Sequence, residues 1–324
     1  MYRHRLIVAF LVIFLVGCTA PTSEKTDQDP NVTPEGIRIT PDVVYGHKFG
    51  MALTFDMFQP QNQNGAGVIF INDGGYISPR FSFYKKTNEG LRLPTVEDLE
   101  KMHPAGRAAN IKLFLDKGFT FFDVRHGSSP KFEMSEIVAD LRRAVRFIRF
   151  NAGEYGVDAE RLGLWGGSAG GHLALLLGAT ADIGNSEVTD EFEKETGRVA
   201  AVVVFFTISD LKRLVDSLRQ SNPDVLKQAP ILDIGDDQLR EFSPINFFSS
   251  DDPPTLIVHG EKDQTVPINE GESIYQALLK AGVETKFVKI PGVGHSFEGE
   301  NEDRAKDQAL AETISWFAEH LVGK

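Results

Sequence analysis

A serine, an aspartate and a histidine that lie far apart in the chain have the residue types of a nucleophilic site. Ser168 is the central residue of Gly166-Gly167-Ser168-Ala169-Gly170, a G-x-S-x-G sequence, and Asp263 and His295 follow it in that order. A serine hydroxyl is a poor nucleophile near neutral pH, so it needs a base to take its proton and an acid to orient that base. The chemistry expected of such a set is attack on a carbonyl carbon.

The residues around Ser168 predict a tight turn between a strand and a helix. A strand is expected at 161–165 and a helix at 171–179. Glycine two residues to either side of the serine lets the turn close, with the serine in a strained backbone and its hydroxyl exposed above the sheet. The amides at the start of the helix then face the charge that develops when the serine attacks. A glycine-rich turn without chemistry is the alternative interpretation.

The expected positions of Asp263 and His295 suit a base and its orienting acid. Asp263 follows a strand expected at 255–258, and His295 follows one expected at 286–290, so both lie at the carboxyl ends of strands. Glu261, two residues before Asp263, is an alternative orienting acid. The remaining candidate acids are less well placed, because they precede that strand or lie in an insertion: Asp236, Asp237, Asp251 and Asp252.

For three further histidines we expect a structural role. His259 ends an apolar strand and is expected to be a hydrogen-bonded core residue, and His172 is expected to pack beneath the site. His126 is expected in a turn, with a place in the pocket wall as the alternative. No spacing of His, Asp and Glu predicts a metal site, and the dinucleotide fingerprint G-x-G-x-x-G with its acidic partner is absent, so no cofactor is expected.

The elements that must position these residues alternate between strands and helices from Ile37 onward. This pattern predicts an α/β protein with a mostly parallel twisted sheet and helices on both faces. A hairpin at 43–45 and 51–58 is expected to open it. The other expected strands are 68–71, 119–124, 161–165, 199–206, 255–258 and 286–290, and the expected helices are 105–117, 137–148, 171–179, 274–281 and 305–321.

Three stretches fit this alternation poorly: 76–104, 182–198 and 211–244. Each follows an element at the expected carboxyl edge of the sheet, where ligands bind in open α/β folds. We therefore interpret them as insertions that are candidate walls of a substrate pocket. The stretch 182–198 is rich in acidic residues and is better interpreted as a surface loop.

From about Asp42 to its end the chain resembles an α/β-hydrolase. It is similar to the bacterial esterases related to feruloyl and acetylxylan esterases, the BD-FAE group, which neighbour the hormone-sensitive-lipase-like group. The resemblance is carried by Gly166-Gly167-Ser168-Ala169-Gly170-Gly171-His172, Ser243-Pro244-Ile245-Asn246, Asp252-Pro253-Pro254 before Leu256-Ile257-Val258-His259-Gly260, Asp263 with Val266-Pro267, and Gly292-Val293-Gly294-His295-Ser296-Phe297. It implies the α/β-hydrolase fold, with Ser168 as nucleophile, His295 as general base and then acid, and Asp263 as the carboxylate that orients the imidazole.

The resemblance also implies an oxyanion hole made by the backbone N–H groups of Ala169, Gly74 and Gly75. Where that family has His-Gly-Gly-Gly and an aromatic residue, this chain has Asn72-Asp73-Gly74-Gly75-Tyr76. The donors are main-chain groups, so the Asn72 amide is expected to brace the loop in place of the family's histidine. A carboxylate 4 Å from the oxyanion would oppose it by about 4 kcal/mol at an effective dielectric constant of about 20, so Asp73 is expected to point away from the pocket.

The amino-terminal residues predict an export signal. Arg3 and Arg5 precede an apolar run from Leu6 to Val16, which is too short to span a membrane. Leu15-Val16-Gly17-Cys18 resembles a bacterial lipobox, which implies lipidation of Cys18, the chain's single cysteine. An ordinary export signal is the alternative. The expected divisions are a signal peptide at 1–17, a flexible linker at 18–36 and an α/β-hydrolase domain at 37–324. Thr19 is not the aspartate of inner-membrane retention, which favours the outer membrane of the cell envelope.

The composition of the chain limits the classes of partner that we expect. The chain has 324 residues, a net charge of −12 and 41% hydrophobic residues, which suits a globular protein and disfavours nucleic acid as a partner. One cysteine allows no internal disulfide. The partners expected are a small-molecule ester and a membrane, the latter through the lipid on Cys18.

The expected activity is that of a serine carboxylic-ester hydrolase that acts through an acyl-enzyme on small or medium esters, with acyl groups on carbohydrates as candidates. Two alternatives stay open. One is a prolyl-oligopeptidase-like serine peptidase, which shares this domain. The other is a non-catalytic, lipid-anchored binding protein with a decayed hydrolase fold, for which Asn72-Asp73 is the best support.

Overall fold

The computed structural model describes residues 31–33, 35–79, 85–87, 90–92, 107–181, 183–184, 186–221 and 224–323. The predicted signal peptide at 1–17, the lipidation site Cys18 and most of the predicted linker lie outside these residues. So does most of the insertion at 76–104.

A sheet of eight strands in the order β1-β2-β6-β3-β7-β8-β9-β10 forms the centre of the molecule. The hairpin of β1 and β2 is antiparallel and joins β6 antiparallel, while β6, β3 and β7 to β10 run parallel. The strands are β1 (Arg38–Lys48), β2 (Met51–Gln59), β3 (Gly67–Ile71), β6 (Thr120–Val124), β7 (Leu162–Gly167), β8 (Ala201–Phe205), β9 (Thr255–Gly260) and β10 (Thr285–Ile290), and a separate pair is formed by β4 (Lys85–Thr87) and β5 (Gly90–Arg92). The predicted opening hairpin and mostly parallel sheet are confirmed.

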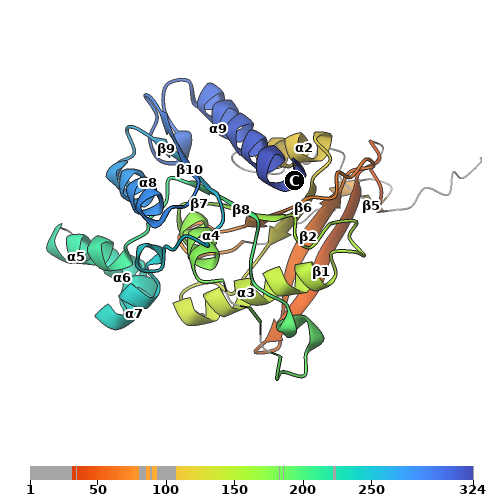
Figure 1. Ribbon diagram of the computed structural model, residues 1–324, viewed down its shortest axis with the longest axis horizontal. Helices are drawn as coiled ribbons and strands as arrows, with labels where there is room; N and C mark the ends of the chain where they lie inside the picture. The colour runs from red at the N-terminus through yellow and green to blue at the C-terminus, as the bar shows by residue number, and fades with distance from the viewer. Residues whose placement is uncertain are drawn as a thin grey trace, which may run out of the picture.

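Helices cover the two faces of this sheet (Figure 1). The long helices are α2 (Arg107–Asp116), α3 (Met134–Phe150), α4 (Ala169–Ala179), α5 (Leu211–Ser221), α8 (Asn269–Ala281) and α9 (Glu302–Phe317), and the short ones are α6 (Asp224–Gln228) and α7 (Asp236–Glu241). One hydrophobic core lies under α3, α4 and α8, and a second lies under α2 and α9. Among the helices described, none combines the length and the apolarity needed to cross a membrane.

The helix α3 shows how sequence spacing produces this layering. Apolar residues of its predicted stripe, Ile137, Leu141, Val145 and Ile148, are all buried. They recur every three or four residues, so they share one side of a helix that turns every 3.6 residues. Burial of such side chains contributes about 1.5–3 kcal/mol each, which docks α3 on the sheet.

The folded part begins before Ile37, which corrects the carboxyl end of the predicted linker. The N–H of Ile39 donates to the Asn31 carbonyl at 2.8 Å, and the N–H of Thr33 donates to the Ile37 carbonyl at 2.8 Å. Thr33 is only 3% exposed, and its hydroxyl accepts from the N–H of Ile37. The polar composition of this stretch suggested a spacer, but its backbone groups pair with the start of β1.

Candidate active site

Ser168 lies in the turn between β7 and α4, with φ 52° and ψ −122°. This left-handed φ is costly for a non-glycine residue and is characteristic of functional sites. A Cβ at Gly166 would meet the Gly170 carbonyl oxygen at 2.3 Å, and one at Gly170 would meet the Ile71 carbonyl oxygen at 2.9 Å. The Ser168 carbonyl also accepts from the Thr207 hydroxyl at 2.9 Å. The turn therefore requires both glycines and is held from β8.

The structure brings Ser168, His295 and Asp263 into one hydrogen-bonded chain. His295 Nε2 lies 3.1 Å from Ser168 Oγ, and His295 Nδ1 lies 2.8 Å from Asp263 Oδ2. A carboxylate only accepts, so Nδ1 carries the proton and Nε2 presents its lone pair to the serine hydroxyl. This arrangement allows His295 to remove the serine proton.

The carboxylate of Asp263 is buried and held by several donors. Its Oδ1 accepts from the N–H groups of Thr265 at 2.9 Å and Val266 at 2.8 Å, and His259 Nε2 lies 3.3 Å from Oδ2. Burial alone would raise the pKa of Asp263, but the hydrogen bonds from His259, His295 and Val266 hold that pKa well below its ordinary value. Asp263 is therefore ionised at neutral pH.

His259 contributes more than sequence reasoning assigned to it. It is fully buried, and its Nε2–H donates to the Val266 carbonyl at 2.8 Å while it faces Asp263. The prediction of a hydrogen-bonded core histidine describes this contact, but not its second role of supporting Asp263. The four-residue separation of His259 from Asp263 was the available signal.

The alternative acids lie away from His295. Glu261 is exposed, whereas Asp263, two residues later, is buried. Asp251 pairs with Arg198 at 2.6 Å, and Asp252 contacts Ser249, both before β9 begins. Asp236 and Asp237 pair with Arg219 and Arg240. These are surface interactions, which contribute little to stability.

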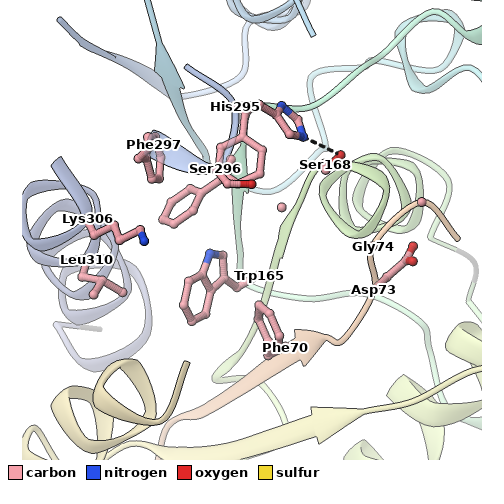
Figure 2. Close-up of a pocket in the computed structure, with 14 residues that line it drawn as sticks. Phe70, Asp73, Gly74, Trp165, Ser168, His295, Ser296, Phe297, Lys306 and Leu310 are labelled. Atoms are coloured by element: carbon pink, nitrogen blue, oxygen red, sulfur yellow. Dashed lines mark hydrogen bonds between the residues drawn. The ribbon is translucent and has the colours of Figure 1, made fainter. Parts of the chain in front are cut away.

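A cavity of about 440 Å³ opens beside Ser168 and His295 (Figure 2). Its apolar wall consists of Phe70, Trp165, Phe205, Phe206, Phe297 and Leu310. The Phe206 ring meets the His295 ring edge to face at 4.8 Å. Phe206, Ser296 and Phe297 all have positive φ, so strained backbone gathers around the site.

The walls of this cavity correct the predicted wall role of the insertion at 211–244 and agree with the surface-loop interpretation of 182–198. No described residue of 182–198 or 211–244 lines it. Lys306 and Leu310 of α9 form part of its wall instead, which sequence reasoning missed. The insertion at 211–244 folds as α5, α6 and α7, and its Phe242 carbonyl accepts from His172 Nε2 at 2.7 Å. It therefore supports the site from beneath.

Of the three N–H groups predicted to form the oxyanion hole, one is already engaged in another hydrogen bond. The N–H of Gly74 donates to the Ile77 carbonyl at 3.0 Å, which corrects its assignment as a free donor. Gly75 and Tyr76 both have positive φ, as in the two-residue turn of a tight hairpin, and that turn closes the Gly74–Ile77 bridge. The N–H groups of Gly75 and Ala169 have no acceptor among the described residues.

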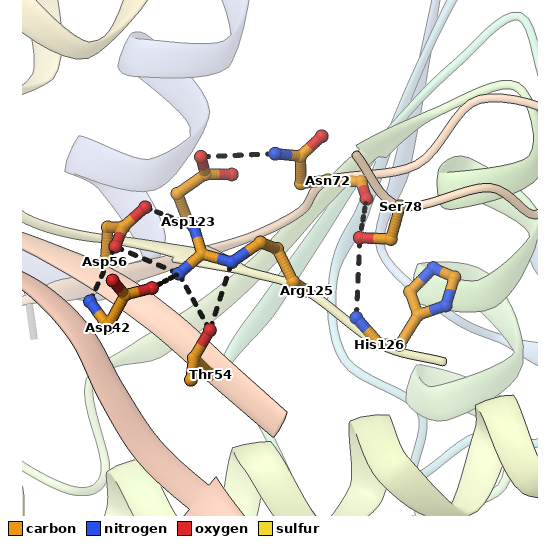
Figure 3. A network of polar contacts seen from close by, with 8 residues as sticks. All are labelled: Asp42, Thr54, Asp56, Asn72, Ser78, Asp123, Arg125 and His126. Carbon is orange, nitrogen blue, oxygen red and sulfur yellow. Dashed lines mark hydrogen bonds and ion pairs between the residues drawn. The ribbon is translucent and has the colours of Figure 1, made fainter. Parts of the chain in front are cut away.

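Asn72 braces this loop, as predicted from its amide. Its Nδ2 donates to Asp123 Oδ2 at 3.2 Å, its N–H donates to the Val124 carbonyl at 3.0 Å, and its own carbonyl accepts from the Ser78 hydroxyl at 2.5 Å. Figure 3 shows these contacts beside a buried cluster around Arg125. There Arg125 Nη2 lies 2.9 Å from Asp56 Oδ1 and 3.2 Å from Asp42 Oδ1. The loop is thereby tied to β6, and the neighbouring Arg125 joins the end of β6 to β1 and β2.

The Asp73 carboxylate points away from Ser168 (Figure 2). Its side chain is fully buried, and its Oδ2 lies 3.7 Å from His126 Nε2. His126 Nδ1 donates to the Gly127 carbonyl at 2.8 Å, so its other nitrogen faces the carboxylate. The Asp73 carboxylate therefore faces His126, on the side away from Ser168.

His172 is a buried structural residue beneath the elbow, as expected. Its Nε2–H donates to Phe242, and its Nδ1 accepts from the Tyr76 hydroxyl at 3.2 Å. Burial lowers its pKa to about 4, against a small opposing effect of the Phe242 carbonyl. It is neutral at neutral pH.

One group of potential metal ligands occurs among the described residues, at the edge of the sheet opposite Ser168. Ligand atoms of Glu284, Glu319 and His320 lie within 4.8 Å of one another, and both glutamates are exposed. None of the three residues lines the cavity beside Ser168.

The sheet order and the strand-turn-helix setting of Ser168 are those of the α/β-hydrolase fold. A truncated carbohydrate esterase from gut microbiota has this fold, with a TM-score of 0.65, 22% identity, and coverage of 87% of this chain and 95% of that one. So has the butyrate-bound esterase Est2 of Thermogutta terrifontis, with a TM-score of 0.65, 22% identity, and coverage of 90% and 97%. The predicted fold class is confirmed.

The chain belongs to the BD-FAE family, whose sequence pattern matches residues 97–278. The pattern of the dienelactone hydrolase family matches residues 243–321. Ser168 lies in the first match, His295 in the second and Asp263 in both. The chain is also similar to the probable carboxylic ester hydrolase LipM of Mycobacterium tuberculosis, with 26% identity over 198 residues, 60% of this chain and 46% of LipM. It spans about half the length of the curated relatives it matches.

Proposed function

We propose that this protein is a serine carboxylic-ester hydrolase, with Ser168 as nucleophile, His295 as general base and acid, and Asp263 as the orienting carboxylate. The observation that carries the proposal is the hydrogen-bonded chain from Ser168 Oγ through His295 to the buried Asp263, at 3.1 and 2.8 Å. Membership of the BD-FAE family and similarity to a probable carboxylic ester hydrolase support it.

Acylation begins when Ser168 Oγ attacks the ester carbonyl carbon and His295 Nε2 takes the hydroxyl proton. The carbonyl oxygen becomes an oxyanion, for which the N–H groups of Ala169 and Gly75 are the proposed donors. When the tetrahedral intermediate collapses, the bond to the alcohol oxygen breaks, and His295 gives its proton to the departing alkoxide.

Deacylation repeats these transfers with water. His295 removes a proton from water as the oxygen attacks the acyl carbon, and the second tetrahedral intermediate releases the acid and restores the serine hydroxyl. Throughout both halves, Asp263 stabilises the imidazolium without itself taking the proton. Each cycle consumes one ester and one water and forms one acid and one alcohol.

The proposed substrates are small or medium esters, with acyl groups on carbohydrates among them. A cavity of about 440 Å³ accommodates an acyl or aryl group of that size. The similar structures include one described as a carbohydrate esterase and one with butyrate bound. These descriptions belong to those proteins and guide the choice of substrates to screen.

Labelling by a fluorophosphonate probe tests the nucleophile. We expect the wild type to be labelled and to hydrolyse p-nitrophenyl acetate, and Ser168→Ala to lose both. Ser273→Ala, which removes a half-buried serine of α8, is the matched control and should retain both. Cleavage of peptidyl-anilides in preference to esters would favour a peptidase, and a wild type that is not labelled would favour a binding protein.

We also propose that the chain is exported and anchored to the bacterial cell envelope by a lipid on Cys18, with the outer membrane favoured. The support is the sequence Leu15-Val16-Gly17-Cys18 after an apolar run that begins at Leu6. In a bacterial host given an alkyne fatty acid, the wild type should become labelled and sediment with membranes. Cys18→Ala should do neither, and labelling of that variant would contradict the proposal.

A further inference from the structure

Two of the polar groups that line the cavity beside Ser168, and that the proposed hydrolytic mechanism does not use, are both hydrogen-bond donors. Lys306 of α9 lines this cavity, and in Figure 2 its side chain reaches from the helix toward Trp165. Trp165, within β7, is only 3% exposed, and its indole N–H has no hydrogen-bond partner among the residues that the structure describes. A buried N–H without an acceptor is unfavourable, so this one is available to a ligand.

Both groups are donors. Among the described cavity residues, Phe70, Phe205, Phe297 and Leu310 have side chains with no polar atom, while Ser296 contributes a hydroxyl. The Lys306 ammonium also contacts the Glu302 carboxylate on α9. A hydroxyl bound there would accept a hydrogen bond but would carry no charge to pair with the ammonium. A carboxylate has only acceptor sites, and it accepts up to four hydrogen bonds.

We infer that the part of the ester that fills this cavity ends in a carboxylate, which Lys306 and Trp165 bind. The substrates are then monoesters of dicarboxylic acids or esters of alcohols that carry a carboxylate. The aromatic wall holds the aryl or methylene body between that carboxylate and the ester group. This inference rests on the proposed esterase function and names specificity-determining residues for it.

The partner of Lys306 is compatible with this role. Its ammonium contacts Glu302 four residues earlier on α9, and the two side chains are 27% and 42% exposed. A solvent-accessible i,i+4 pair of this kind contributes little to stability, so a carboxylate held in the cavity can compete with it. Burial of the ligand carboxylate requires a cation, because an unpaired buried charge is costly.

Two pairs of esters test the inference. In the acyl pair, p-nitrophenyl 4-carboxybenzoate is compared with p-nitrophenyl 4-methylbenzoate. In the alcohol pair, 4-acetoxybenzoate is compared with 4-methylphenyl acetate. Each kcat/KM is divided by the rate constant for alkaline hydrolysis of the same ester, which removes the effect of intrinsic reactivity. The ratio of the two normalised values, acidic over neutral, is the measured preference.

We expect the wild type to prefer the acidic ester by about tenfold or more in one pair, since a charge-assisted hydrogen bond contributes about 1.5–3 kcal/mol. Preference in the acyl pair assigns the cavity to the acyl group, and preference in the alcohol pair assigns it to the alcohol. Either outcome supports the inference. Absence of preference in both pairs, from an enzyme that hydrolyses the neutral esters, overturns it and leaves the proposed function intact.

Single substitutions test whether Lys306 and Trp165 cause the preference for the acidic ester. Lys306→Met should lower it by about tenfold, Lys306→Arg should keep it, and Trp165→Phe should lower it while retaining an aromatic wall. Glu302→Gln removes the competing carboxylate and should raise it. Lys286→Met is the matched control, because it removes the same charge from an exposed pair with Glu312 and should leave the preference unchanged. A preference unaltered in Lys306→Met contradicts the assignment, whereas failure of the wild type on every ester contradicts the proposed function itself.

Discussion

At the scale of single residues, the contacts of Asp263 decide the state of His295. Asp263 accepts from two backbone N–H groups through one oxygen, and it accepts from His295 Nδ1 through the other. These bonds fix the carboxylate in the loop after β9 and leave it one orientation toward the imidazole. The position of the histidine lone pair therefore depends on Asp263 being an acceptor on that side.

Replacement of Asp263 by a side chain that donates to His295 should strongly reduce activity. Asp263→Asn can donate to Nδ1, which favours the tautomer with its proton on Nε2, and that tautomer cannot take the serine proton. We expect kcat for p-nitrophenyl acetate to fall by about 10³–10⁴-fold with little change in circular dichroism. Glu261→Gln should change kcat less than twofold, since Glu261 is exposed and outside the hydrogen-bonded chain. The reverse result would make Glu261 the orienting acid.

Asp73 allows a second prediction at this scale. Its carboxylate lies 3.7 Å from His126 and points away from Ser168. If it instead faced the oxyanion at about 4 Å, its removal would relieve about 4 kcal/mol and raise kcat by about 10³-fold. We expect Asp73→Gly to leave kcat unchanged or lower. A strong increase in kcat, measured with p-nitrophenyl acetate, would show that the carboxylate opposes the reaction.

At the scale of elements, α4 and the insertion at 211–244 act together beneath the elbow. His172 of α4 is joined to the Phe242 carbonyl after α7 and to the Tyr76 hydroxyl after β3. Segments that are 96 and 70 residues from His172 in sequence thus meet at one imidazole. The helix carries both the residue after the nucleophile and the anchor that holds two loops.

This buried histidine should make stability depend on pH. Its pKa is about 4 in the folded protein, below the ordinary value of about 6.5 in the unfolded chain. As pH falls below about 6.5, the unfolded chain takes up a proton that the folded protein does not, so the free energy of unfolding falls, by about 2 kcal/mol between pH 7 and pH 5. Urea denaturation at the two pH values should show this loss in the wild type and about 2 kcal/mol less of it in His172→Gln. An equal loss in both would contradict the assignment.

At the scale of the whole molecule, the described cavity and hydrogen-bonded chain are built from residues of β3, β7, β8, α9 and the loops after β9 and β10. Residues 31–36 lie outside this set, and they contribute backbone pairing at the start of β1. We therefore expect the residues before Ile37 to affect the stability of the fold and not the activity.

Truncations test that boundary. A chain that begins at Asn31 should keep kcat/KM within about twofold of the full chain and should keep its Tm. A chain that begins at Ile37 loses the bonds of Asn31 and Thr33, and it should melt about 5 °C lower, since each hydrogen bond contributes about 1 kcal/mol. Thermal denaturation of the two chains decides this. Equal melting temperatures would show that the folded part begins at Ile37, as first predicted.

The sequence by itself determined the order and type of the elements, because a strand, a helix or an elbow follows from residues within one short window. The period of the α3 stripe and the glycines around Ser168 are signals of this kind. Tertiary structure alone decided that the Gly74 N–H is used within its own hairpin and that α9 lines the cavity through Lys306. Those outcomes depend on how distant segments pack and on which backbone groups remain unpaired after packing, and no local pattern of residue types records either.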